Sequence, residues 1–429
     1  MLNLAAAFIT VTTLLTYINY KVMKLPPAIG VMVNALLLSV GIQMLSFLGF
    51  PGVEAELKEL VQGIDFHEIL MKWFLPALLF AGALHVNIND LKEHRIEITG
   101  LATIGVIVST FAIGYAAYFL LGAIGWNVSL LYCLIFGALI SPTDPIAVMG
   151  ILKSSGAPKP LRMTIVGESL FNDGTAVVAF SIILMLITLD TDPTMGTISM
   201  LFAQEAIGGI AFGLLLGYAT TKLIETIDEP QLTVMLTLAM VFGGSALASY
   251  LHISAPIVVV VAGLMIGNKG RSLAMSESER RYVDKFWELI DEILNASLFA
   301  LIGLELLLVD FTLMHAMAAI ALGFVMLLSR YAIAVPGIFV MNRLHKSNEP
   351  MFKKGSGLVL AWGGLRGGIS VALALALPAG PERDIILPIT YVIVLGSIII
   401  QGLTIGSLIR LLFGEKTEPA DSKEVTATV

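Results

Sequence analysis

PLRMTIVGESLFNDGTAVVAFSIILMLITL, residues 160–189, is an apolar stretch that contains two carboxylates, Glu168 and Asp173. It is long enough to cross a bilayer as a helix. An ionisable side chain at the centre of a bilayer costs roughly 2.5–3.5 kcal/mol on insertion scales, so such residues are rare in membrane helices. They are typical of helices along which protons or ions pass. The stretch therefore predicts a membrane helix with a functional site near its middle.

The composition of the whole chain also indicates a membrane protein. Hydrophobic residues make up 57% of the 429 residues and charged residues 13%, whereas soluble domains carry about 25% charged residues. The single cysteine, Cys133, lies in an apolar run, so the chain has neither a disulfide framework nor a cysteine metal cluster. No nucleic-acid-binding pattern or cleavable signal is evident. We expect an all-α polytopic membrane protein without a cofactor.

Apolar segments separated by short polar loops predict about 13 transmembrane helices. They are expected at about 2–20, 26–49, 68–90, 96–124, 128–152, 160–189, 196–225, 230–251, 254–268, 284–308, 311–341, 352–379 and 384–414. Together they would form a single transmembrane domain over residues 1–414. The polar segment 415–429 is predicted to be a disordered cytoplasmic tail.

The distribution of basic residues predicts the orientation in the membrane. Alternate loops, beginning with the one that holds Lys21 and Lys24, contain most of the 25 Lys and Arg residues. The loops of the opposite side contain only Lys58, Lys72 and Arg383. Because basic loops stay in the cytoplasm, we expect the N-terminus outside and the C-terminus inside. The expected location is the plasma membrane of a bacterial or archaeal cell.

Two of the predicted spans are interrupted near their middle. In the fifth, SPTDP at residues 141–145 contains two prolines, each of which removes a backbone N–H and disfavours helix at the preceding residue. In the twelfth, WGGLRGG at residues 362–368 surrounds Arg366 with glycines, which weaken a helix. Two interrupted spans in corresponding places of two halves indicate an inverted-repeat transporter. Simple proline and glycine kinks are the alternative.

Helical spacing sorts the polar residues of the sixth span into two neighbouring stripes. Ser169 lies four residues before Asp173, and Glu168 lies four residues before Asn172. Ser169 Oγ, the Asp173 carboxylate and carbonyls freed near Thr143 would supply the oxygen ligands for a transported Na⁺. A proton and a cation would compete for the Asp173 carboxylate, and this competition by itself would couple their fluxes.

Two arginines within predicted spans would balance the intramembrane carboxylates. Arg330, in the eleventh span, is expected to pair with Glu168; the alternative is that it extends to the cytoplasmic surface. Arg366 would compensate Asp144 or the dipoles of the half-helices, or it would cap carbonyls of the unwound segment. These roles of Arg366 are compatible with one another.

Three segments resemble a known family. GESLFNDG at residues 167–174, SPTDPIAV at 141–148 and GLRGG at 364–368 are similar to the NhaP-type branch of the monovalent cation–proton antiporters, which includes the eukaryotic sodium–proton exchangers. The resemblance extends over essentially all the predicted spans. It implies a homodimer with a separate dimerisation domain and a six-helix core. In that core, two broken helices would cross near the ion site.

The resemblance also implies roles for individual residues. Asp173 would bind the ion and the proton, with Asn172 as its partner. Glu168 and an arginine, which Arg330 fits by its position, would form the salt bridge that holds this asparagine. The residues that the resemblance places at the transported ion are Asp173, Ser169, Thr143 and Asp144.

One segment departs from the pattern of the family. Many members have a glutamate of the ion site in a FEGAL-like third span, whereas LFAGAL at residues 79–84 has Ala81 in that place. The site therefore has one carboxylate fewer, which leaves the choice among Na⁺, Li⁺ and K⁺ open. His85 follows one turn later, where it would sense pH or make a packing hydrogen bond.

Three classes of function are compatible with intramembrane carboxylates. The first is a secondary antiporter that exchanges Na⁺, Li⁺ or K⁺ for H⁺ by alternating access and contributes to pH homeostasis. Because Asn172 stands where an electrogenic relative would have a second aspartate, we expect electroneutral exchange. The second class, an intramembrane aspartyl protease using Asp144 and Asp173, lacks its glycine-x-glycine-aspartate context. The third, a channel, lacks a TVGYG-type filter. The sequence therefore favours a transporter over an enzyme.

Overall fold

The computed structural model describes residues 2–50, 66–144, 151, 152, 154–188, 195–344 and 351–414, together with Gly52 and Lys58. Within these residues the secondary structure is helical. In chain order the α-helices are α1 (Leu2–Ile18), α2 (Pro27–Phe47), α4 (Phe66–Ile69), α5 (Leu75–Leu84), α6 (Ile88–Glu93), α7 (Arg95–Thr99), α8 (Val106–Ala123), α9 (Leu130–Ile140), α11 (Lys159–Thr188), α12 (Met195–Ile224), α13 (Pro230–Tyr250), α14 (Ala255–Met265), α15 (Arg271–Leu273), α16 (Glu277–Glu305), α17 (Leu313–Leu344), α18 (Ser356–Trp362), α19 (Gly368–Leu375), α20 (Pro381–Gly396) and α21 (Gly402–Phe413). Segments with π-helical hydrogen bonding extend some of them: η1 (Asn19–Met23), η2 (Leu70–Phe74), η3 (Gly100–Gly105), η4 (Ile266–Gly270) and η5 (Ser397–Gln401).

Each range predicted to cross the membrane overlaps at least one of these helices. In the described part of the chain, eight helices are long and apolar enough to span a bilayer by themselves. The other predicted spans fall short of this measure for local reasons. The apolar helices at Leu130–Ile140 and Ala255–Gly270 are shorter, the span at 352–379 is divided into α18 and α19, and α16 begins with a charged segment.

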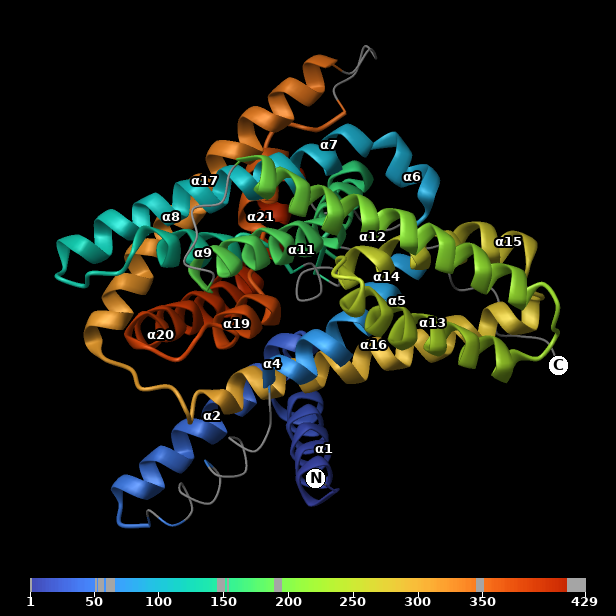
Figure 1. Cartoon of the computed structure of the whole chain (residues 1–429). Helices are drawn as coiled ribbons and strands as arrows, with labels where there is room; N and C mark the ends of the chain where they lie inside the picture. Colours follow the sequence, from blue (N-terminus) through green and yellow to red (C-terminus); the bar gives the residue numbers. More distant parts are fainter. Residues whose placement is uncertain are drawn as a thin grey trace.

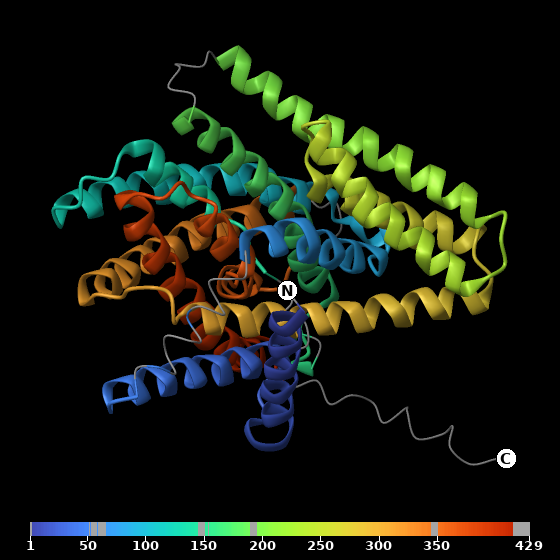
Figure 2. The same ribbon diagram turned by 60° about the horizontal axis from the view of Figure 1, so that its bottom comes forward.

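Helix α12 runs beside α13, and α13 also packs against α16, whereas α1 runs across α2 and α16 (Figures 1 and 2). The N-terminal half of α16 packs on α13 and α5, and α2 packs along α16 as well. Helix α16 has 29 residues, and besides α2, α5 and α13 it contacts α1 and α19.

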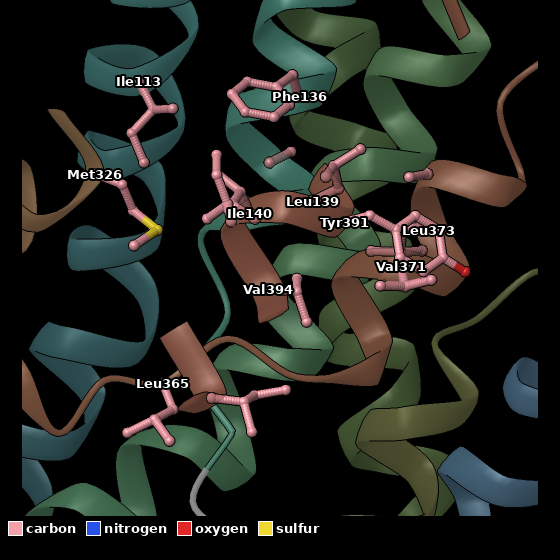
Figure 3. Close-up of a cluster of buried hydrophobic side chains, with 14 of the residues drawn as sticks. Ile113, Phe136, Leu139, Ile140, Met326, Leu365, Val371, Leu373, Tyr391 and Val394 are labelled. Atoms are coloured by element: carbon pink, nitrogen blue, oxygen red, sulfur yellow. The ribbon is translucent and has the colours of Figure 1, made fainter. Parts of the chain in front are cut away.

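Buried apolar side chains form two large clusters. The first joins α8, α9, α17, α19 and α20 and includes the side chains of Phe136, Met326 and Tyr391 (Figure 3). The second joins α5, α13, α14 and the first half of α16. Helix α11 contributes Val177 to the first cluster and Leu170 to the second. The helix that bears the intramembrane carboxylates is therefore packed into both clusters.

The two interrupted spans cross at their breaks. Residues 141–144 follow α9 without helical structure, and residues 363–367 separate α18 from α19. The backbone N–H of Asp144 donates a hydrogen bond of 2.8 Å to the carbonyl of Leu365. A Cβ atom on Gly367 would lie 2.1 Å from Asp144 Oδ2, so only glycine permits this approach. The crossing of two broken helices is thus present, and glycine makes it possible.

Candidate functional site

The polar residues of α11 are buried against the first break. Glu168, Ser169 and Asn172 are at most 1% exposed, and Asp173 is 6% exposed. Ser169 Oγ lies 3.0 Å from Thr143 Oγ1 and also donates a hydrogen bond to the Thr143 carbonyl. This carbonyl can accept the bond because residues 142–144, which follow α9, are not helical. The structure thus brings together the hydroxyl and carbonyl oxygens that the sequence predicts for an ion site.

Asn172 is bound to the first break. Its Nδ2 donates a hydrogen bond of 2.8 Å to Thr143 Oγ1. Its Oδ1 is buried and has no hydrogen-bond partner among the described residues. The family resemblance makes Asn172 the partner of Asp173, whereas the hydrogen bond seen in the structure joins it to Thr143. Asn172 therefore fixes the orientation of the threonine whose oxygens face Ser169.

Glu168 and Arg330 form a buried ion pair. Arg330 Nη2 donates to Glu168 Oε2 over 2.7 Å, and Nη1 donates to Oε1. The Glu168 side chain is 1% exposed and the Arg330 side chain is 7% exposed. The predicted pairing is present, and the alternative in which Arg330 extends to the surface is wrong. A bidentate, charge-assisted contact of this kind fixes both side chains in one geometry.

Arg366, from the second break, lies at the C-terminal end of α9, and Asp144, from the first break, lies at the N-terminal end of α19. Arg366 Nη1 donates to the carbonyls of Ser141 and Pro142, at 2.5 and 2.9 Å, just beyond the C-terminus of α9. Asp144 lies against Gly367, the residue that precedes α19. A helix carries partial negative charge at its C-terminus and partial positive charge at its N-terminus. Arg366 therefore takes both the carbonyl-capping role and the dipole-compensating role that the sequence left open.

A cavity of about 520 Å³ reaches these residues. Its buried lining includes Pro142, Thr143, Ser169 and Asp173, with Asp144 beside them. Its exposed end is lined by Asp90, Lys159 and Arg162, and Lys159 Nζ lies 2.9 Å from Asp90 Oδ1. These three residues belong to the side that the charge distribution predicts to be cytoplasmic. A continuous space thus joins the predicted cytoplasmic loops to Asp173.

The third-span segment contributes packing residues and part of the cavity wall. Ala81 is buried in the second hydrophobic cluster, while its neighbour Gly82 lines the cavity. His85 Nδ1 donates a hydrogen bond of 2.8 Å to the Ala81 carbonyl, and the ring lines the cavity with its side chain 44% exposed. His85 therefore makes the predicted packing hydrogen bond and is also accessible from the cavity.

The polar residues of the cavity that were missed at the level of sequence include Asp291 of α16 and Ser370 of α19. A signal for Asp291 exists, since it lies seven residues before Leu298, on the same face of one helix. Leu298 also lines the cavity. Periodicity alone does not say which face of α16 turns toward α11.

Comparisons with known proteins give consistent results. The family model described as "Sodium/hydrogen exchanger, transmembrane" matches residues 9–411. The chain is 59% identical to the Na(+)/H(+) antiporter NhaP of Pseudomonas aeruginosa, over 98% of this chain and 100% of that protein. It is 35% identical to the Na(+)/H(+) antiporter NhaH of Halobacillus dabanensis, over 91% of this chain and 93% of that protein.

Among solved structures, the sodium proton antiporter MjNhaP1 from Methanocaldococcus jannaschii at pH 8 superposes with a TM-score of 0.74. The sequence identity is 21%, and the superposition covers 96% of this chain and 98% of that chain. At this identity the likeness establishes a common fold.

Proposed function

This chain belongs to the sodium/hydrogen exchanger family and is a multi-pass membrane Na⁺/H⁺ antiporter rather than an enzyme, and we propose that Asp173 is the residue at which the two ions exchange. The observation that carries the proposal is the cavity that ends at Asp173, Ser169 and Thr143. Its buried end combines one carboxylate with hydroxyl and carbonyl oxygens, the donor types that a hard monovalent cation prefers. A proton and the cation would then compete for the same carboxylate.

The hydrogen bonds around Thr143 support a simple binding step. Ser169 donates its hydrogen to the Thr143 carbonyl, so both oxygens already lie close together. When a cation enters, the Ser169 hydroxyl turns its hydrogen away, and both oxygens can then face the ion beside Asp173. Asn172 holds Thr143 Oγ1 during this change. The site would thus be largely formed before the ion arrives.

The charges near Asp173 support an exchange of one proton for one cation. Arg330 holds Glu168 as an ion pair, and Asp144 lies at the positive end of α19. If neither of these acids takes part in the exchange, Asp173 is the carboxylate that takes up and releases the proton. The exchange would then move no net charge across the membrane.

The remaining features of the proposal concern the whole molecule. The cavity would represent the state open to the cytoplasm, with the N-terminus outside and the C-terminus inside in the plasma membrane. About 13 crossings in two inverted repeats would allow the site to open alternately to the two sides. We further propose a homodimer. In the cell, the exchange of Na⁺, Li⁺ or K⁺ for H⁺ would serve pH homeostasis.

The decisive experiment is a fluorescence dequenching assay of the pH gradient in proteoliposomes, with Na⁺, Li⁺ and K⁺ added in turn. Asp173→Asn should abolish the response to every cation while thermal unfolding shows a folded protein. Glu292→Gln, which removes an exposed carboxylate of α16, is the matched control and should keep the parental activity. Exchange by Asp173→Asn above a small fraction of the parental rate would refute the assignment. Single-channel currents would refute alternating access.

A further inference from the structure

The part of the cavity wall formed by α16 and α19 carries polar groups that the Asp173 site does not use. Asp291 from α16 and Ser370 from α19 line the same cavity that reaches Asp173. Asn295 lies one turn after Asp291, on the same face of α16. The two helices approach closely, because a Cβ atom on Gly368 would lie 2.4 Å from Leu298 Cδ1. A carboxylate and a hydroxyl from two elements therefore line the cavity, and the amide of Asn295 lies one turn after the carboxylate.

Two oxygens in this region are buried without a hydrogen bond. Ser370 Oγ and Asn295 Oδ1 have no partner in the described part of the chain, and their residues are 1% and 7% exposed. A buried polar atom without a partner is destabilising and rare in folded proteins, so each such atom requires an explanation. A hydrated or partly dehydrated cation would interact favourably with both oxygens and with the Asp291 carboxylate.

The other charged groups of the cavity leave Asp291 available. At the mouth, Asp90 is paired with Lys159. At the buried end, Asp144 lies against Gly367. The remaining basic groups in the lining are Arg162 and His85. His85 Nε2 lies 3.9 Å from Asp284, and no salt bridge to Asp291 is present among the described residues, so the negative charge of Asp291 can act on a passing cation.

We propose that Asp291, Asn295 and Ser370 form a second cation station, at which Na⁺ is held between the cavity mouth and Asp173. The proposal rests on the proposed function and adds a binding step to it. Position 81 of the third span is an alanine, packed in a hydrophobic cluster, so it supplies no carboxylate to the cavity. Helix α16 supplies one, Asp291. A weak station of this kind lets the ion lose part of its hydration and still move on.

The test is the apparent KM for Na⁺ in everted membrane vesicles, where added Na⁺ meets the cytoplasmic face. Asp291→Asn should raise the KM by about tenfold while the rate at saturating Na⁺ is retained, since ion affinity follows the number and charge of the ligands. Ser370→Ala should raise the KM by about threefold without any change of charge. The ratio of the KM values for Na⁺, Li⁺ and K⁺ should change in both variants.

Two matched controls accompany these variants. Glu292→Gln removes a neighbouring carboxylate of α16 that does not belong to the cavity lining. Ser356→Ala removes another buried hydroxyl without a hydrogen-bond partner, also away from the cavity. Both should keep the parental KM. Should Asp291→Asn fail to fold, Asp291→Glu and Ser370→Ala provide the same comparison, with thermal unfolding as the check on folding.

The results separate this station from the Asp173 site. If Asp173→Asn abolishes exchange but Asp291→Asn and Ser370→Ala leave the KM within twofold of the parent, the station is refuted and the proposed function stands. If only Asp291→Asn has an effect, and choline chloride removes that effect by screening, Asp291 attracts cations without binding them and the station is refuted. If Asp173→Asn retains exchange, the proposed function itself fails.

Discussion

Arg330 binds Glu168 through two guanidinium nitrogens, although 162 positions separate the residues in the chain. The pair lies beside the crossing of the broken helices. A Cβ atom on Gly364, in the second break, would lie 2.9 Å from Arg330 Nε. One ion pair therefore joins α11 to α17 and limits which residue the second break can contain at position 364.

Breaking this pair should destabilise the protein. Glu168→Gln or Arg330→Ala leaves one buried charge without its partner, which typically costs about 3–5 kcal/mol. We expect a lower melting temperature or poor expression for each single variant. The variant that neutralises both residues should recover part of the loss. Thermal unfolding in detergent measures the effect, and parental stability in both single variants would contradict the structural role of the pair.

Exchange should be insensitive to membrane potential. If only Asp173 carries the proton, one cation replaces one proton and no net charge moves, whereas each net charge would contribute about 2.3 kcal/mol per 100 mV. The rate of Na⁺-driven proton efflux from vesicles should stay constant when valinomycin and K⁺ clamp the potential at different values. A rate that follows the potential would show that a second group titrates, and Asp144→Asn would identify it.

Replacing Arg366 should destabilise the crossing of the broken helices. Arg366→Gln removes the positive charge beside the carbonyls of Ser141 and Pro142. Leaving buried groups of this kind unsatisfied costs about 1–3 kcal/mol. Arg366→Lys keeps the charge and should lose less. Melting temperatures of the two variants provide the comparison, and equal losses would show that charge at the end of α9 contributes little.

Acid should weaken the contact between the starts of α13 and α16. Glu279 precedes the predicted span 284–308 and accepts hydrogen bonds from Thr233 Oγ1 at 2.5 Å and from the backbone N–H of Ser276 at 2.8 Å. Burial raises the pKa of Glu279, but the hydrogen bonds from Thr233 and Ser276 outweigh this effect, so the pKa lies below its ordinary value of 4.5. A lowered folded-state pKa stabilises the protein above the ordinary pKa, and this contribution disappears as the pH falls below 4.5.

Glu279→Gln should therefore lower the melting temperature at pH 7 and reduce its dependence on pH between about 5 and 3. Glu277→Gln is the matched control, because Glu277 lies in the same helical turn and is exposed. An unchanged acid dependence in Glu279→Gln, measured by thermal unfolding in detergent, would show that this carboxylate does not contribute to the acid sensitivity.

The sequence alone predicted the helical class, the buried carboxylates of α11 and the two broken segments. These features follow from local properties: the length of an apolar run, the cost of a charge within it, and the backbone restrictions of proline and glycine. Spacing along one helix also placed Ser169 and Asp173 on one face. The family resemblance added the expectation that the two breaks cross, which the contact between Asp144 and Leu365 confirms.

The tertiary structure decided which groups face one another. The sequence offered two positions for Arg330 and several roles for Arg366, and packing placed Arg330 on Glu168 and Arg366 on the end of α9. Packing also turned Asn172 toward Thr143 and brought Asp291 to the cavity. Hydrophobicity determines that a segment is buried, but the direction of a polar side chain depends on partners that lie far away in the chain. Those partners are set only when the helices pack together.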